Sequence, residues 1–269
     1  MNFFYRAITI LGITTVLGGL TPAVKPQPPQ TSPVQVQTVD FLNRGLERAK
    51  RRDFQGAILD YNQAIRANPN LALAYKNRGM AHHDLGNFNL AITDFDQALR
   101  INPNDADTYN KRADARSDLG DYQGGISDWN QVIRVNPHYA EAYNNRAIAR
   151  AALNDKEKAI TDWNQAIRLN PSYADAYYNR GKARADLGDN SGAISDYTQA
   201  LHQNPNLAEA YGNRGVLLSK LGDNSGALED LQKAAKLFAE QGERDSYQQT
   251  LNLINVIHPS NRQPDHLDF

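Results

Sequence analysis

Six positions spaced 34 residues apart carry an amide or an amine side chain. We expect each of them to lie on a helix of its own, and all six to occupy the same face of their respective helices. They are Asn43, Asn77, Lys111, Asn145, Asn179 and Asn213. A carboxamide holds a hydrogen-bond donor beside an acceptor, so it can bind a peptide group of an extended chain whatever side chains that chain carries. The column predicts a groove that binds polypeptide backbone. A second interpretation stays open, in which each asparagine only bonds locally within its own helix.

Neighbouring positions on the same face would select among partner side chains. Carboxylates gather in the middle of the array, at Asp107, Asp114 and Glu141. A cleft lined by one sign of charge concentrates ligands of the other sign, so a partner segment with basic residues is favoured. Further candidates along the groove are Lys76, Asn110, Asn144, Tyr178 and Lys182.

Two other columns combine opposite charges. The arginines are Arg44, Arg78, Arg112, Arg146, Arg180 and Arg214, and the aspartates are Asp60, Asp94, Asp128, Asp162, Asp196 and Asp230. A basic spine that follows phosphates would need a basic surplus, whereas the formal net charge of the chain is -1. A carboxylate also matches the forked geometry of a guanidinium. We therefore expect partly buried ion pairs inside each repeat and no nucleic-acid binding.

Nothing in the sequence indicates catalysis, a metal site or a cofactor. The chain has no cysteine, which excludes disulfides, thiol catalysis and thiolate metal ligands. The six histidines are scattered, and His82 and His83 are adjacent, whereas two metal ligands on one helix are three or four residues apart. The sequence predicts a protein that is not an enzyme.

These columns require a repeated pair of helices to position them. Small and apolar residues recur at three- and four-residue intervals from Ala106 to Leu119, and Gly120 should end that helix in the left-handed conformation. The second helix should end at Asn136, since the following proline disfavours helical geometry there. Neither helix can bury its apolar side alone, so successive pairs must stack.

Further columns share the same period. An Asn-Pro pair ends at Pro69, Pro103, Pro137, Pro171 and Pro205, and aromatic residues stand at Phe41, Tyr75, Tyr109, Tyr143, Tyr177 and Tyr211, with a second set at Tyr61, Phe95, Trp129, Trp163 and Tyr197. Together with the small residues between them, these columns resemble the tetratricopeptide repeat over residues 38–241. The resemblance implies an all-α fold, a right-handed superhelical solenoid of six helix-turn-helix repeats at 38–71, 72–105, 106–139, 140–173, 174–207 and 208–241.

The two ends of the array depart from the repeat. In the first repeat, Arg51 and Arg52 replace the usual Leu-Gly and suggest a polar cap. In the last repeat Ala239 replaces the closing proline, so the final helix should run on. Residues 242–257 form an amphipathic set suited to a C-terminal capping helix, and residues 258–269 should be a disordered tail.

The N-terminal residues suggest export. Residues 1–23 combine a positively charged start with a short apolar run, as in a signal peptide, although an uncleaved membrane anchor is the alternative. Residues 24–37 are rich in proline and should form an extended linker. The folded array should therefore lie in the periplasm or another extracytoplasmic compartment, either free or tethered to the membrane.

The combined prediction is a non-catalytic scaffold for protein–protein interaction. Its concave groove would bind an extended peptide segment of a partner protein, and that segment would carry basic residues. The scaffold would act in the assembly of an envelope or membrane complex. The resemblance supports this prediction, because the asparagine column is similar to the ladder in the superhelix of the O-linked N-acetylglucosamine transferase, although no transferase domain is present here. The alternative is a structural array that assembles with itself through its ends or its convex face, and the sequence leaves the oligomeric state open.

Overall fold

Six helix pairs and one additional helix make up the part of the chain that the computed structural model describes, residues 33–258. The pairs are α1 (Pro33–Lys50) with α2 (Phe54–Ala67), α3 (Ala72–Asp84) with α4 (Phe88–Ile101), α5 (Ala106–Asp118) with α6 (Tyr122–Val135), α7 (Ala140–Ala152) with α8 (Lys156–Leu169), α9 (Ala174–Asp186) with α10 (Asn190–Gln203), and α11 (Ala208–Lys220) with α12 (Asn224–Gln241). Helix α13 (Arg244–Ile257) follows the last pair. The expected all-α repeat architecture is confirmed.

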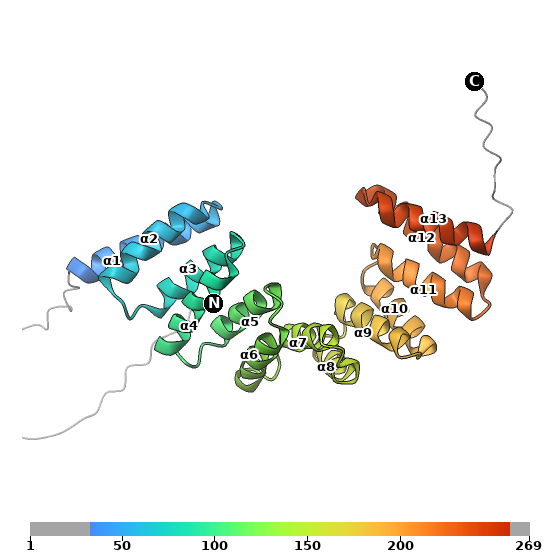
Figure 1. Cartoon of the computed structure of the whole chain (residues 1–269), viewed down its shortest axis with the longest axis horizontal. Coiled ribbons are helices and arrows are strands. Elements are labelled where there is room, and N and C mark those ends of the chain that lie inside the picture. The colour runs from blue at the N-terminus through green and yellow to red at the C-terminus, as the bar shows by residue number, and fades with distance from the viewer. Residues whose placement is uncertain (1–32, 259–269) are drawn as a thin grey trace, which may run out of the picture.

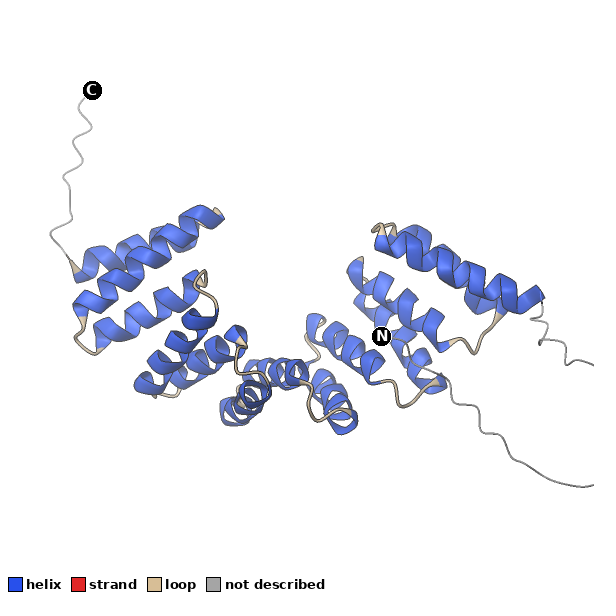
Figure 2. Ribbon diagram, turned by 180° about the vertical axis from the view of Figure 1, so that it is seen from behind, coloured by secondary structure: helices blue, strands red, loops and turns tan. Residues whose placement is uncertain are grey.

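The pairs stack into a curved array. Figure 1 shows an arch in which α5 and α7 lie on the inner side and α6 and α8 on the outer side. The first helices of neighbouring repeats also contact one another, α1 with α3, α3 with α5 and α7 with α9. Figure 2 shows the same arch from behind, with short loops joining the helices. The first helix of each pair therefore forms the concave face.

Each turn between paired helices depends on one left-handed residue. Gly120 has a φ of 86°, and Asn154 occupies the equivalent position with a φ of 62°. Arg52 also has a φ of 62°. Asparagine tolerates this conformation better than most residues, so the expected helix ends are confirmed, while arginine at this position carries a steric cost that glycine avoids.

Aromatic residues of the second helices fill the space between the paired helices. Tyr61, Phe95, Trp129, Trp163 and Tyr197 have exposures of 0–2%, and each packs among small residues. At the C-terminal end α12 does run on to Gln241, and Ile254 of α13 packs against Leu231 and Ala235. Helix α13 therefore covers the apolar side of the last repeat, as expected of a capping helix.

The expectation of an extended linker up to residue 37 is wrong for its last five residues. Helix α1 begins at Pro33, so residues 33–37 are helical. Proline is well accommodated at the first position of a helix, where its missing N–H would have no partner, and no proline follows until Pro69.

Three sequence-based expectations fall on residues that the structure does not describe. The signal or anchor at 1–23, the linker up to residue 32 and the tail at 259–269 lie outside the described residues. Among the described residues, none of the helices is long and apolar enough to cross a membrane.

Candidate binding groove

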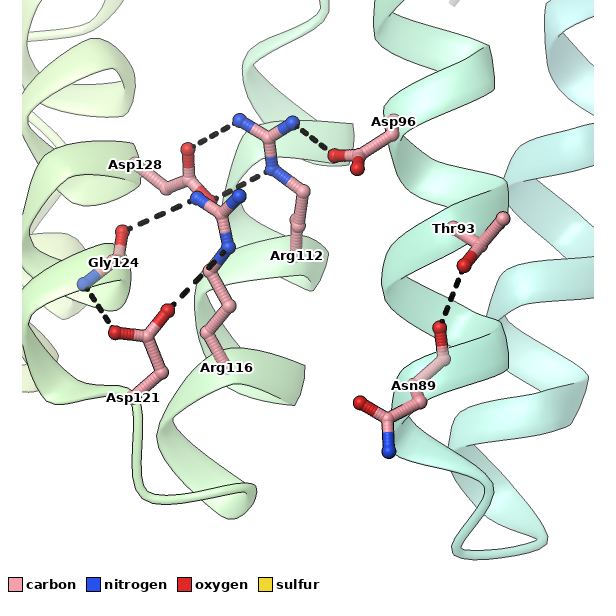
Figure 3. Close-up of polar contacts among 8 residues, drawn as sticks. All are labelled: Asn89, Thr93, Asp96, Arg112, Arg116, Asp121, Gly124 and Asp128. Atoms are coloured by element: carbon pink, nitrogen blue, oxygen red, sulfur yellow. Dashed lines mark hydrogen bonds and ion pairs between the residues drawn. The ribbon is translucent and has the colours of Figure 1, made fainter.

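The first helix of each repeat is held by a buried carboxylate of the second helix. Asp128 of α6 is 2% exposed and accepts two hydrogen bonds from Arg112 of α5, one from Nε at 2.9 Å and one from Nη2 at 2.6 Å. Arg116, one turn later on α5, donates a third bond of 2.8 Å to the same carboxylate (Figure 3). The expected internal ion pair is confirmed here.

The same arrangement recurs along the array and links neighbouring repeats. The other pairs are Arg44–Asp60, Arg78–Asp94, Arg146–Asp162, Arg180–Asp196 and Arg214–Asp230. Each arginine of the column also lies over the aromatic ring three residues before it, 5.1–5.7 Å from the ring centroid. From the second repeat onward it bonds a polar residue on the second helix of the preceding repeat, namely Asn62, Asp96, Asn130, Asn164 or Thr198. Neither of these last two contacts was expected from the sequence.

The groove asparagines immediately precede these arginines but differ in their hydrogen bonding. Asn77 donates to the backbone oxygen of Leu73 at 2.8 Å, which is the kind of local bond that the second interpretation expects. Asn145 accepts a long 3.3 Å bond from Asn144. Asn43 is exposed on α1, whereas the other five members of the column, Asn77, Lys111, Asn145, Asn179 and Asn213, are half-buried.

At the C-terminal end of the groove the structure brings Tyr178 together with Asn213. Asn213 donates to the Tyr178 hydroxyl at 3.4 Å, and the Tyr178 ring lies 5.9 Å from that of Tyr197. Burial raises the pKa of Tyr178, and nearby Glu209 adds to the effect. The phenol therefore stays neutral and is able to act as a hydrogen-bond donor or acceptor in the groove.

Ion pairs join groove residues from successive repeats. Lys76 of α3 lies 2.9 Å from Asp107 of α5 and 3.4 Å from Asp105. Burial alone would lower the pKa of Lys76, but its hydrogen bond to Asp107 and the charges of both aspartates raise it. Glu141 on α7 accepts a 3.0 Å bond from the Tyr139 hydroxyl. One of the three expected groove carboxylates, Asp107, is therefore already neutralised by a lysine.

Asp114 lies in a different environment from Asp107. Burial raises its pKa to about 6, and the charges of Glu141 and Asp118 contribute in the same direction, against Lys111 and His83. Its Oδ2 accepts a 3.4 Å bond from Asn110. A carboxylate that is half-buried among other carboxylates is stabilised by an incoming cation, so this residue supports the expectation of a basic partner.

The expectation that Asn110 and Asn144 line the groove is wrong. Asn110 is 3% exposed and its Oδ1 accepts a 3.1 Å bond from the indole N–H of Trp129. Asn144 is 4% exposed and binds Trp163 in the same way at 3.1 Å. An indole N–H buried between helices requires an acceptor, and these asparagines provide it.

We expect Asn110→Leu to lower the free energy of unfolding by about 1–3 kcal/mol, because the buried Trp129 N–H would lose its acceptor. Urea unfolding of Asn110→Leu, Trp129→Phe and the double variant forms a double-mutant cycle that isolates the hydrogen bond from the change in packing. Additive losses in the cycle would show that this bond contributes nothing to stability.

Family models match most of the repeat array. Models described as TPR repeat or Tetratricopeptide repeat match residues 45–86, 72–105, 95–126, 149–188, 181–222 and 208–241. These matches cover well over half of the chain. No curated protein matched it.

Solved structures of similar fold include MamA, YrrB and PilW. A structure of MamA is 27% identical with a TM-score of 0.58, covering 61% of this chain and 96% of that one. YrrB, described as a TPR protein with an unusual peptide-binding site, is 21% identical with a TM-score of 0.56, covering 66% and 91%. PilW, described as a type IV pilus biogenesis factor, is 19% identical with a TM-score of 0.67, covering 81% and 99%. At under 25% identity, the last two similarities concern the fold alone.

Proposed function

Because this chain belongs to the tetratricopeptide repeat family, we propose that it is a non-catalytic scaffold whose concave groove binds an extended segment of a partner protein. The observation that carries the proposal is the ladder of half-buried polar side chains at Asn77, Lys111, Asn145, Asn179 and Asn213, one for each of these five repeats. Regularly spaced hydrogen-bonding groups match the regularly spaced peptide groups of an extended chain. The similarly folded YrrB, described as having a peptide-binding site, supports the proposal by analogy of fold.

The proposal includes export and assembly of an envelope or membrane complex. The apolar run within residues 1–23 supports export, with the array either released by cleavage or left tethered to the membrane. The fold shared with PilW, described as a type IV pilus biogenesis factor, supports a role in assembly by analogy of fold. The partner segment is expected to be basic, because Asp114 and Glu141 lie in the middle of the groove.

Site-specific photocrosslinking tests the groove directly. A photoreactive amino acid at position 179, on the concave face, should form a covalent adduct with the partner in cells. The same amino acid at position 127, where Ser127 is exposed on α6 of the outer side, is the matched control and should not. Adducts from position 127 alone would place the partner on the convex face and contradict the proposal.

Self-assembly through the ends is a second candidate, favoured by apolar residues at both ends of the arch. Helix α1 exposes Val36 and Val39 by 48% and 52%, so the first repeat is not the purely polar cap that Arg51 and Arg52 suggested. Helix α13 exposes Leu253 and Val256 by 40% and 78%. Contact between two different ends would produce open head-to-tail chains. Sedimentation of the purified array without a partner tests this candidate. If the array assembles with itself, its apparent molecular mass will rise with protein concentration.

A further inference from the structure

Two hollows of the concave face occupy the same place in the repeat. One, of about 210 Å³, lies between α3, α4 and α5, and the other, of about 300 Å³, lies between α7, α8 and α9. Every residue that lines the first has a counterpart two repeats later that lines the second. The pairs are Met80 with Ile148, His83 with Ala151, Asp84 with Ala152, Phe95 with Trp163, Lys111 with Asn179, and Asp114 with Lys182.

The first hollow favours a cation. Its lining includes the carboxylates of Asp84 and Asp114 and the amine of Lys111. His83 is already bonded to Asp118, with Nε2 2.8 Å from Oδ2. Met80 provides an apolar wall for the methylene groups of a long side chain, with the buried Phe95 ring behind it. The hollow therefore combines an apolar entrance with unneutralised negative charge, which suits the side chain of lysine or arginine.

The second hollow has the opposite character. Ala151 and Ala152 replace the polar His83 and Asp84. Ile148, which is 41% exposed, adds apolar surface, and the buried Trp163 ring lies behind it. On its rim Lys156 is paired with Asp186 at 2.8 Å, so the exposed Lys182 leaves a surplus of one positive charge. This hollow suits an apolar side chain whose neighbour in the partner is acidic.

We propose that the two hollows are side-chain subsites of one groove, the first selecting a basic residue and the second an apolar residue next to an acidic residue of the same partner segment. The inference rests on the proposed function, because the bound segment must run along the concave face from α3 to α9. The subsites add what backbone-directed asparagines cannot provide, namely a preference for one sequence and one direction of the partner chain.

Binding of short synthetic peptides tests the subsites. The probes are fluorescent peptides in a serine-glycine background, carrying one lysine and one Leu-Glu pair at every separation and in both orders. The wild-type array should bind best at one separation and one order. Changing the lysine to glutamate should weaken binding about tenfold or more, the lower end of the effect of close charge pairs across interfaces.

Charge reversal of the array should move each preference separately. Asp114→Lys should switch the first position from lysine to glutamate, and Lys182→Glu should switch the second pair from Leu-Glu to Leu-Lys. Asp245→Lys and Lys233→Glu, at exposed positions of α13 and α12, are the matched controls and should change neither preference. Thermal melts by circular dichroism confirm that each variant is folded.

The pH dependence of binding provides a third readout for the first subsite. Asp114 has a raised pKa of about 6 and is mostly protonated below that pH, so affinity for the lysine peptide should rise as the pH increases from about 5 to about 7. Other titratable or charged groups face Asp114, namely His83 and Asp84 on α3, Lys111 and Asp118 on α5, and Glu141 on α7. The comparison is therefore with Asp114→Asn, which should remove this rise.

The outcomes separate the inference from the proposed function. Peptide binding that depends on the groove asparagines but is indifferent to lysine, to Leu-Glu and to both charge reversals would overturn the subsites and leave the groove intact. Absence of peptide binding together with absence of adducts from position 179 would overturn both. A preference that survives Asp114→Lys and Lys182→Glu unchanged would place selectivity elsewhere and also contradict the inference.

Discussion

Replacing Asp128 with alanine should lower the free energy of unfolding by about 3 kcal/mol, the lower end of the loss expected when one partner of a buried ion pair is removed. The carboxylate is 2% exposed and accepts bonds from both Arg112 and Arg116, so its removal leaves two guanidinium groups without their main partner. The lower end applies because Arg112 keeps its bond to Asp96, and both arginine side chains still reach water, with exposures of 15% and 22%.

Asp96→Ala is the matched control for this change. Asp96 binds the same guanidinium as Asp128, at 2.5 Å, but its side chain is 45% exposed. Its loss should therefore cost less than about 1 kcal/mol, as for other surface pairs. Urea unfolding of both variants gives the comparison. If Asp128→Ala lowers the free energy of unfolding by less than about 1 kcal/mol, the ion pair is not needed for stability. That result would favour the alternative in which the arginine column binds phosphate.

The sequence was sufficient to predict the pairing of Arg112 with Asp128 but only part of its surroundings. The two columns keep a constant separation and opposite charges in every repeat, so their pairing follows from the repeat alone. The bond from Arg112 to Asp96 runs to the preceding repeat, where the equivalent residues vary between asparagine, aspartate and threonine. A partner whose chemistry changes from one repeat to the next does not form a recognisable column.

The burial of individual groove side chains could not be predicted from the sequence, because it depends on the aromatic residue of the second helix packed behind them. Asn110 and Tyr178 occupy equivalent positions in their repeats. Asn110 is buried and bonded to Trp129, whereas Tyr178 is half-buried beside Tyr197. The periodicity places both residues on the same helical face without showing which aromatic ring fills the space behind them. The two hollows escaped prediction for the same reason, since their volumes depend on several side chains from three helices.

The same dependence on the opposing ring explains a pattern in the small residues. A Cβ atom added to Gly79 would lie 2.8 Å from the Phe95 ring, and one added to Gly181 would lie 2.9 Å from the Tyr197 ring. Gly79 and Gly181 belong to a column of small residues spaced 34 apart, Gly45, Gly79, Ala113, Ala147, Gly181 and Gly215. Alanine occurs in it only in the two repeats whose second helix carries a tryptophan. The two tryptophan repeats thus combine this alanine with the buried asparagine that accepts the indole N–H, Asn110 or Asn144. The other repeats have glycine in place of this alanine.

Asn145→Ala combined with Asn179→Ala should weaken partner binding by roughly 5- to 150-fold, since each lost hydrogen bond to a peptide group costs about 0.5–1.5 kcal/mol. Asn145 makes a long 3.3 Å contact with Asn144, and Asn179 lines the second hollow, so both are placed to bind a partner. The fold should be unaffected because alanine favours helix more than asparagine does. Isothermal calorimetry with the captured partner or the best synthetic peptide measures the change.

The same column supplies a matched control, Asn77→Ala combined with Asn213→Ala. The amide nitrogen of Asn77 already donates to the Leu73 backbone oxygen, and that of Asn213 donates to the Tyr178 hydroxyl. These amides have less hydrogen-bonding capacity left for a partner, so their removal should weaken binding by less than about fivefold, the lower bound expected for two lost bonds. Equal effects of the two double variants would show that local bonding does not decide which asparagines bind the partner. Unchanged affinity in both would exclude the asparagine column from binding and move the interface to the ends or the convex face.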